Sequence, residues 1–318
     1  MRAVGVDTKS ILLSDFSGSD RGASDDSAEP ASSSRRVANP TSQRQGSVPH
    51  MLKQRVITAF AMLFGLLGAV FLMPRGGWMA VCSAVVGVAA WEWRGLQARS
   101  GVSRFLFSFV TVSFFGATVV AIGLAETPAS YSAGLASVLA CGVGFWLAIA
   151  PFWLGAKWPM HRPGVGTMVG WLVIVPAGVA LVVLRDIDPW MLLAAMSVVW
   201  VADIAAYFVG RAFGKRKLAP SISPGKSWEG AIGAVVFVLI FGIVVATTWP
   251  ALGVDIRRGV GTQLAYAAVL VLLTGVSIVG DLFESLAKRQ AGVKDSGSIL
   301  PGHGGLLDRI DSLTSTLP

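Results

Sequence analysis

Charged residues are scarce in this sequence. They account for 14% of its 318 residues, whereas 53% are hydrophobic, and the mean hydropathy is +0.65. Soluble domains carry about 25% charged residues, so this composition excludes an ordinary water-soluble domain. It predicts an all-α bundle of helices that is integral to a membrane and crosses it several times.

Cysteine and histidine are also rare, with two and three residues respectively. Cys82 and Cys141 lie in apolar runs without the spacing of zinc ligands, so we expect two small core residues and no disulfide framework. The net charge is +8. In a membrane protein this charge indicates Lys- and Arg-rich cytoplasmic loops that face anionic headgroups. We therefore expect membrane lipids as partners and no nucleic acid.

The first fifty residues have a different composition from the rest. Residues 1–50 are rich in Ser, Asp, Arg and Gly and contain one aromatic residue, so they cannot bury a core and are predicted to form a disordered polar tail. They contain no apolar core of a secretory signal. The tail is either a dispensable extension or lies upstream of the true start codon, Met51.

Eight apolar runs approach the length of about 20 residues that a membrane span needs. They cover residues 56–73, 77–93, 105–125, 132–155, 165–184, 190–210, 229–249 and 261–283. Lys and Arg gather in alternate connections, which predicts a cytoplasmic N-terminus. We divide the spans into an N-terminal region, 51–200, and a C-terminal region, 201–318, with cytoplasmic loops 211–228 and 284–318. No internal repeat of the kind found in many transporters is visible.

Four ionisable residues lie within or at the end of predicted spans: Glu92, Asp203, Asp281 and Glu284. Such residues are costly in lipid and are functional candidates by default. In the last span, Asp281, Glu284, Ser285 and Lys288 follow the i, i+3, i+4, i+7 spacing of one helical face. This polar stripe predicts the wall of a wet cleft. For Glu92, a role in an interfacial belt and a functional role are both open.

The segment KDSGSILPGHGGLLDRIDS, residues 294–312, is dense in glycine and charge. Asp308 and Asp311 are three residues apart and would repel each other on a helix unless a cation lay between them. Mg²⁺ suits such carboxylate ligands and usually also binds substrate phosphates. The GHGG glycines allow backbone N–H groups to face an anion, as would the N-terminus of a helix over 306–312. This equipment is typical of phosphoryl or nucleotidyl transfer.

The loop segment SISPGKSWEG contains a second candidate site. Lys226 precedes a helix that Ser227 could cap, and Pro224 and Gly225 are predicted to form a turn. Lys226 is therefore a candidate for contact with a phosphate or a headgroup. The cations at 215–217 are better explained as a positive-inside anchor.

The segment SLAKRQAGVKDSGSILPGHGGLLDRIDS resembles the phosphatidate cytidylyltransferase family, also called CDP-diacylglycerol synthases. SPGKSWEG and the stretch from Asp203 to Gly210 also resemble this family, and the match is specific over roughly residues 200–312. Ala287 stands where the family usually has a larger apolar residue. The family pattern also continues into one further membrane helix after this motif, and the sequence ends at Pro318.

The resemblance implies that CTP and phosphatidic acid react to give CDP-diacylglycerol and pyrophosphate at the cytoplasmic face of the cell inner membrane. It implies Mg²⁺ as cofactor, with room for a second cation. The implied metal ligands are Asp281, Asp308 and Asp311. The other implied catalytic residues are Lys294 and His303. The implied substrate-binding residues are Asp203, Ser223, Lys226, Ser285, Lys288, Arg289, Asp295, Gly304, Gly305 and Arg309.

Two other functions remain open at this point. A transporter could use Asp203 and Asp281 as ion sites, but this leaves the GHGG and DRID segments unexplained. A nucleotidyltransferase acting on a different lipid phosphate would use the same residues. A homodimer is compatible with the sequence in either case.

Overall fold

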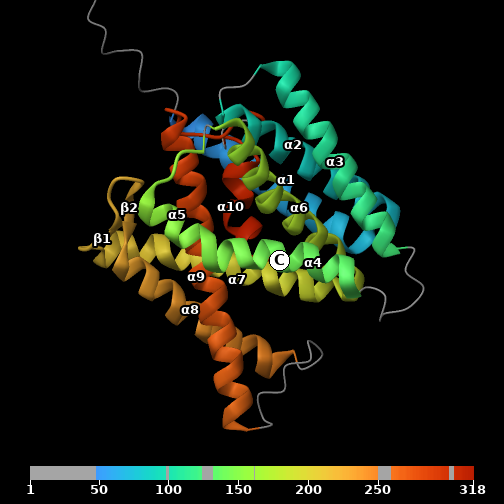
Figure 1. The fold of residues 1–318 in the computed structure, drawn as a ribbon. Coiled ribbons are helices and arrows are strands. Elements are labelled where there is room, and N and C mark those ends of the chain that lie inside the picture. The colour runs from blue at the N-terminus through green and yellow to red at the C-terminus, as the bar shows by residue number, and fades with distance from the viewer. Residues whose placement is uncertain (1–47, 98–99, 124–131, 161, 250–258, 301–303) are drawn as a thin grey trace, which may run out of the picture. The chain divides into compact units, whose positions relative to one another are not determined.

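The computed structural model describes residues 48–97, 100–123, 132–160, 162–249, 259–300 and 304–318 (Figure 1). The helices are α1 (Val48–Leu72), α2 (Arg75–Leu96), α3 (Gly101–Gly123), α4 (Ser132–Gly144), α5 (Ala150–Ala156), α6 (Pro163–Ile187), α7 (Pro189–Phe213), α8 (Trp228–Thr248), α9 (Val260–Gln290) and α10 (Leu307–Thr316). A π-helical turn, η1 (Phe145–Ile149), joins α4 to α5, and the strands are β1 (Lys217–Ala219) and β2 (Ser223–Ser227).

The prediction of a helical, multi-pass membrane protein is confirmed. Within the described residues, six helical segments are long and apolar enough to cross a membrane: Gly101–Ala121, Ala133–Ala156, Gly164–Ile187, Pro189–Phe213, Trp228–Thr248 and Val260–Gln290. The predicted spans 56–73 and 77–93 correspond to α1 and α2, which fall outside this set. The predicted count of eight and the side of the N-terminus therefore stay predictions. Most of the predicted tail lies outside the described residues, and α1 begins at Val48, before Met51.

The core of the bundle is formed by large apolar side chains from several helices. Trp78, Phe115, Trp146 and Phe283 are each at most 2% exposed. Phe283 meets Trp146 edge-on, with ring centroids 5.4 Å apart. Cys82 is a buried member of this core, as expected, whereas Cys141 is exposed. The packed core fixes α9 against η1 and thereby orients the polar face of α9.

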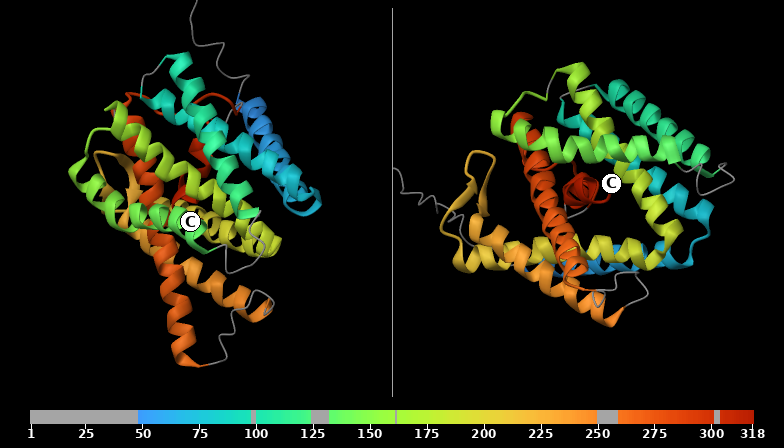
Figure 2. Two further views of the ribbon diagram at one scale, coloured as in Figure 1. Left: turned by 45° about the vertical axis from the view of Figure 1, so that its right-hand side comes forward. Right: turned by 60° about the horizontal axis from the view of Figure 1, so that its bottom comes forward.

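Helix α10 lies in the middle of the bundle, where it packs against α2, α6, α7 and α9 (Figure 2, right). Its C-terminal half is polar but buried, from Ser312 to Thr316. The hydroxyl groups of Thr314, Ser315 and Thr316 donate to main-chain carbonyls, as when Ser315 Oγ donates to Val276 O at 2.9 Å. The helix predicted to open at 306–312 is confirmed, and its N-terminus is held between segments from both halves of the chain.

The connection between α7 and α8 differs from its prediction. Strands β1 and β2 pair antiparallel, and Ile222 N donates to Ala219 O in the turn between them. The predicted turn at Pro224 and Gly225 is wrong because both residues lie in β2. Ile222 is only 5% exposed, so its burial places the turn before Pro224. The predicted cap is confirmed, since Ser227 Oγ accepts from Gly230 N at 3.2 Å.

Candidate functional site

A cavity of about 910 Å³ lies among α7, the β-hairpin, α9 and the start of α10. Most residues predicted from the sequence line it, although they come from distant parts of the chain. These residues are Asp203, Ser223, Lys226, Asp281, Ser285, Lys288, Arg289, Lys294, Asp295, Asp308, Arg309 and Asp311. The structure therefore brings residues of the two predicted cytoplasmic loops, 211–228 and 284–318, to one site.

Among the described residues, the predicted site residues Gly304 and Gly305 do not line this cavity. His303 lies outside the described residues, so its role stays a prediction. Gly304 adopts a left-handed backbone conformation with φ 85°, which favours glycine. Gly305 donates its N–H to Asp308 Oδ2 at 2.9 Å, so this N–H already has a partner within the chain. Phosphate binding by these glycines also stays a prediction.

The polar stripe of α9 forms one wall of the cavity. Asp281 Oδ2 pairs with Lys226 Nζ of β2 at 2.5 Å, and Asp281 Oδ1 lies 3.4 Å from Ser285 Oγ. Asp281, Ser285 and Lys288 face the cavity, as the spacing predicted. Glu284 lies behind them, with a side chain only 5% exposed.

Lys288 connects α9 to α10 through two carboxylates. Its Nζ is 3.0 Å from Glu284 Oε2 and 2.7 Å from Asp308 Oδ1. Asp308 Oδ2 accepts from Ser296 N and Gly305 N, each at 2.9 Å. Burial opposes the charge of Asp308, but the hydrogen bonds from Lys288, Gly305 and Ser296 outweigh it and hold the pKa of Asp308 below its ordinary value. Asp308 is thus an ionised group that fastens the loop before α10.

Asp311 lies in a different environment from Asp308. Burial raises the pKa of Asp311 to about 7, and the nearby carboxylates of Asp281 and Asp203 act in the same direction. Asp203, Asp281 and Asp311 all line the cavity. The cavity therefore brings the negative charge of these three carboxylates together, and a bound cation would relieve their repulsion.

The donor chemistry of this cluster can be compared with what Mg²⁺ requires. Among the described residues, no group of three or more His, Cys, Asp or Glu side chains is placed to hold a metal ion. Mg²⁺ is commonly held by one or two carboxylates together with substrate phosphates and water. Asp281 and Asp311 fit this requirement. Asp308 fits it poorly because its side chain is only 8% exposed, against 30% for Asp281, and it accepts from Lys288 and from two main-chain N–H groups. A metal at this site stays a prediction.

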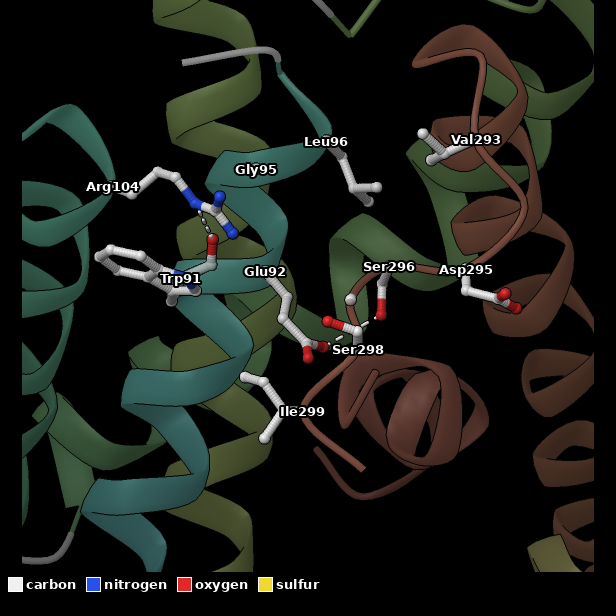
Figure 3. Close-up of a pocket in the computed structure, with 11 residues that line it drawn as sticks. Trp91, Glu92, Gly95, Leu96, Arg104, Val293, Asp295, Ser296, Ser298 and Ile299 are labelled. Atoms are coloured by element: carbon white, nitrogen blue, oxygen red, sulfur yellow. Dashed lines mark hydrogen bonds between the residues drawn. The ribbon is translucent and has the colours of Figure 1, made fainter. Parts of the chain in front are cut away.

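Glu92, whose role was open from the sequence, is fully buried and belongs to the scaffold of the site. It reaches from α2 to the segment before α10 (Figure 3) and accepts from Ser296 Oγ at 3.0 Å. It also accepts from the main-chain N–H groups of Leu306 and Leu307. A carboxylate within an apolar run is unusual, so the sequence marks Glu92 as a candidate. The sequence does not indicate which residues Glu92 contacts.

Taken together, a helical membrane bundle with a cavity lined by Lys, Arg and Asp defines an enzyme class that handles phosphates within a membrane. The Cytidylyltransferase family profile matches residues 53–318. The chain belongs to this family and is a nucleotidyltransferase. This membership argues against the transporter alternative.

Two relatives show how far the similarity extends. The phosphatidate cytidylyltransferase of Pseudomonas aeruginosa is 40% identical over 285 residues, which cover 84% of this chain and 95% of the relative. That of Haemophilus influenzae is 35% identical over 282 residues, which cover 84% of this chain and 96% of the relative. The similarity therefore spans the helices that build the cavity.

Proposed function

We propose that this protein transfers the cytidylyl group of CTP to phosphatidic acid, releasing pyrophosphate and forming CDP-diacylglycerol for phospholipid biosynthesis. The observation that carries the proposal is one cavity that, among the described residues, is lined by seven cations and five carboxylates. The cations are Arg211, Lys217, Lys226, Lys288, Arg289, Lys294 and Arg309, and the carboxylates are Asp203, Asp281, Asp295, Asp308 and Asp311. The names of the relatives supply the two substrates.

The reaction needs charge neutralisation more than it needs a strong base. A phosphate oxygen of phosphatidic acid attacks the α-phosphorus of CTP and forms a new P–O bond. The bond from the α-phosphorus to the oxygen bridging to the β-phosphate breaks, and pyrophosphate leaves with the electron pair. The attacking oxygen is already anionic near neutral pH, so the obstacle is the repulsion between two polyanions.

The residues of the cavity suit this task in different ways. Lys226 and Lys288 are held in place by ion pairs, so they present their charge without a large loss of side-chain freedom. Arg289 is fixed at one end, since its Nε lies 3.4 Å from Ile222 O of the hairpin. Asp281 and Asp311 are the residues that would hold Mg²⁺. When bound, Mg²⁺ would neutralise charge on the CTP phosphates and the leaving pyrophosphate.

The position of the cavity fits a lipid substrate. Ala202, Ala206 and Gly210 line it, so it follows α7 over about 12 Å at 1.5 Å per residue. We propose that acyl chains remain in the lipid while the headgroup enters this cavity from the cytoplasmic leaflet of the inner membrane. Lys and Arg gather in alternate connections between the predicted spans, and the hairpin lies in one of these connections, which supports that orientation.

The direct test uses protein purified in detergent, radiolabelled CTP and phosphatidic acid. The expected result is a lipid-soluble cytidine product and pyrophosphate in equal amounts, formed only when Mg²⁺ is present. A parallel reaction supplies an isoprenoid phosphate as the acceptor. Product with the isoprenoid phosphate and none with phosphatidic acid would assign the alternative nucleotidyl transfer. Absence of product with either acceptor would refute the proposal.

A further inference from the structure

Glu92 is a buried carboxylate whose partners in the structure are all hydrogen-bond donors from one distant segment. It lies in the last turns of α2 and is 0% exposed. Its Oε2 accepts from Ser296 Oγ at 3.0 Å and from Leu307 N at 2.8 Å, and its Oε1 accepts from Leu306 N at 3.0 Å. An isolated buried charge is costly unless it is fully hydrogen-bonded, so this arrangement has a structural purpose.

The two main-chain donors belong to the N-terminus of α10. The first N–H groups of a helix have no partner within the helix and normally receive one from a capping side chain. The N-cap residue of α10 is Leu306, and its apolar side chain cannot accept a hydrogen bond. Glu92 supplies the missing acceptors and places negative charge at the positive end of the helix dipole.

The loop before α10 is held by carboxylates on two sides. Ser296 donates its N–H to Asp308 Oδ2 and its hydroxyl to Glu92 Oε2. Its neighbour Asp295 lines both the 910 Å³ cavity and a second cavity of about 400 Å³ beside Glu92. In Figure 3 the Ser296 side chain points toward Glu92, whereas the Asp295 carboxylate points away from it. The loop is therefore a thin wall between Glu92 and the proposed site.

Two glycines allow this close approach. A Cβ at Gly297 would clash with Glu92 Oε1. A Cβ at Gly305 would lie 2.6 Å from Glu92 Oε2 and would also clash with Ser296 Oγ. Gly305 is the last glycine of the GHGG segment. In the structure, the absence of a side chain at this position makes room for the carboxylate from α2.

We propose that Glu92 is a positioning residue for the reaction: it caps α10 and clamps the 295–297 loop, and so sets the placement of Asp308, Asp311 and Lys288 around the substrate phosphates. This inference rests on the proposed function for its catalytic half. The clamp reaches the phosphate-binding cations through Asp308, which pairs with Lys288. Glu92 itself lies on the far side of the loop from the cavity.

The first experiment replaces the carboxylate with a group of equal size. Glu92→Gln keeps one carbonyl acceptor but turns an NH₂ group toward at least one N–H or O–H donor. Hydrogen exchange at the amides of Ser296, Leu306 and Leu307 should accelerate. In the cytidylyl-transfer assay, kcat should fall by up to about 100-fold, the scale reached when reacting groups move by about 1 Å. The KM for phosphatidic acid should stay unchanged, because α7 is not displaced.

A matched control separates positioning from a loss of stability. Val86 is also buried on α2, 2% exposed, but it lies against Gly178 of α6. Val86→Ala should lower the melting temperature without changing exchange at Leu306 and Leu307 or lowering kcat at a temperature where the protein is folded. An equal loss of kcat in Val86→Ala and Glu92→Gln would assign Glu92 a purely structural role and overturn the proposal.

The second experiment approaches the clamp from the loop and remains informative if one variant folds poorly. Gly297→Ala places a methyl group against the Glu92 carboxylate and should lower kcat. In Glu92→Ala the obstacle is gone, so adding Gly297→Ala should cause little further loss, which makes the double-mutant cycle strongly non-additive. Additive losses would overturn the clamp.

The exchange and kinetic results also separate this inference from the proposed function. Unchanged exchange in Glu92→Gln would refute the clamp, and faster exchange with normal kcat would refute its catalytic role. Wild-type protein that forms no cytidine-containing lipid would refute the proposed function and the catalytic half of the inference. The clamp itself would then be decided by exchange alone.

Discussion

Lys226 of β2 and Asp281 of α9 form an ion pair across the cavity, with Nζ 2.5 Å from Oδ2. The side chains are 23% and 30% exposed, so water reaches both and the pair can open. Asp281 is also one of the two carboxylates best suited to hold Mg²⁺. The Lys226 ammonium group would therefore compete with a divalent cation for Asp281. When the metal binds, this group would move from Asp281 to a substrate phosphate.

This ion pair predicts that removing the Lys226 charge changes the requirements for CTP and for Mg²⁺ in opposite directions. Lys226→Met should raise the KM for CTP, because a phosphate contact is lost. It should lower the Mg²⁺ concentration needed for half-maximal activity, because Asp281 loses its competing cation. Steady-state rates measured over a grid of Mg²⁺ and CTP concentrations test both effects.

Lys215 offers a matched control for this prediction. It lies near the base of the same hairpin and is exposed, but its side chain does not line the cavity. Lys215→Met should leave both constants unchanged. An increased Mg²⁺ requirement in Lys226→Met would contradict competition at Asp281.

Asp308 and Asp311 should respond differently to the same substitution. Asp308→Asn removes the charge that pairs with the buried Lys288, which should lower stability by up to about 3–5 kcal/mol. It should lower turnover without raising the Mg²⁺ requirement. Asp311→Asn should lower turnover by orders of magnitude and raise the Mg²⁺ requirement, because a ligand is lost. Melting curves and Mg²⁺ titrations of both variants test this contrast.

The pH dependence of the melting temperature shows whether the ionised Asp311 side chain stabilises or destabilises the fold. Its pKa is raised from 3.8 to about 7, so in metal-free protein its contribution to stability is present below pH 3.8 and is lost as the pH rises through 7. At pH 8 Asp311→Asn should therefore melt higher than wild type without Mg²⁺, whereas at pH 4 the two should melt alike. A lower melting temperature for Asp311→Asn at pH 8 would show that its charge stabilises the fold.

The sequence predicts the cavity wall better than it predicts what supports the wall. The i, i+4 and i+7 positions of α9 identify Asp281, Ser285 and Lys288 because helical spacing alone decides which residues share a face. Asp308 and Asp311 share the spacing that suggests one common cation. The structure gives them separate roles because Lys288 and two main-chain N–H groups reach only Asp308.

Two other features depend on contacts that no local pattern encodes. Glu92 meets Leu307 across 215 positions of sequence, so only the packing of α2 beside α10 reveals the partner. The hairpin turn precedes Pro224 because Ile222 is buried, and its main-chain oxygen lies near Arg289. A local preference of Pro and Gly for turns is overridden by that burial.

The orientation of the spans can be tested by chemical labelling. Lys and Arg concentrate on the side of the membrane that contains the hairpin, which predicts that this side is cytoplasmic. Cysteines are placed singly at Ser221, in the exposed hairpin turn, and at Thr248, exposed at the end of α8. The background carries Cys141→Ser because that native cysteine is exposed.

An impermeant thiol reagent added to intact cells should modify Thr248→Cys and spare Ser221→Cys. Disrupted cells are the control in which both positions should react. Protection of Thr248→Cys together with labelling of Ser221→Cys in intact cells would reverse the topology. It would also separate the cavity from cytoplasmic CTP.

Lys288 allows stability and catalysis to be separated within one network. Its ammonium group lies between Glu284 Oε2 and Asp308 Oδ1, and its side chain is only 13% exposed. Lys288→Met would leave two buried carboxylates without their cation, which should cost about 3–5 kcal/mol of stability. Adding Glu284→Gln removes one of those charges, so the double variant should regain part of the lost stability. Its turnover should stay low, because neither change restores a cation that faces the substrate phosphates.

Glu284→Gln alone is the control and should keep most of its activity, since its side chain lies behind the cavity. Melting temperatures in detergent and turnover with saturating CTP provide the two measurements. Recovery of turnover in step with recovery of stability would mean that Lys288 acts only by holding α9 and α10 together.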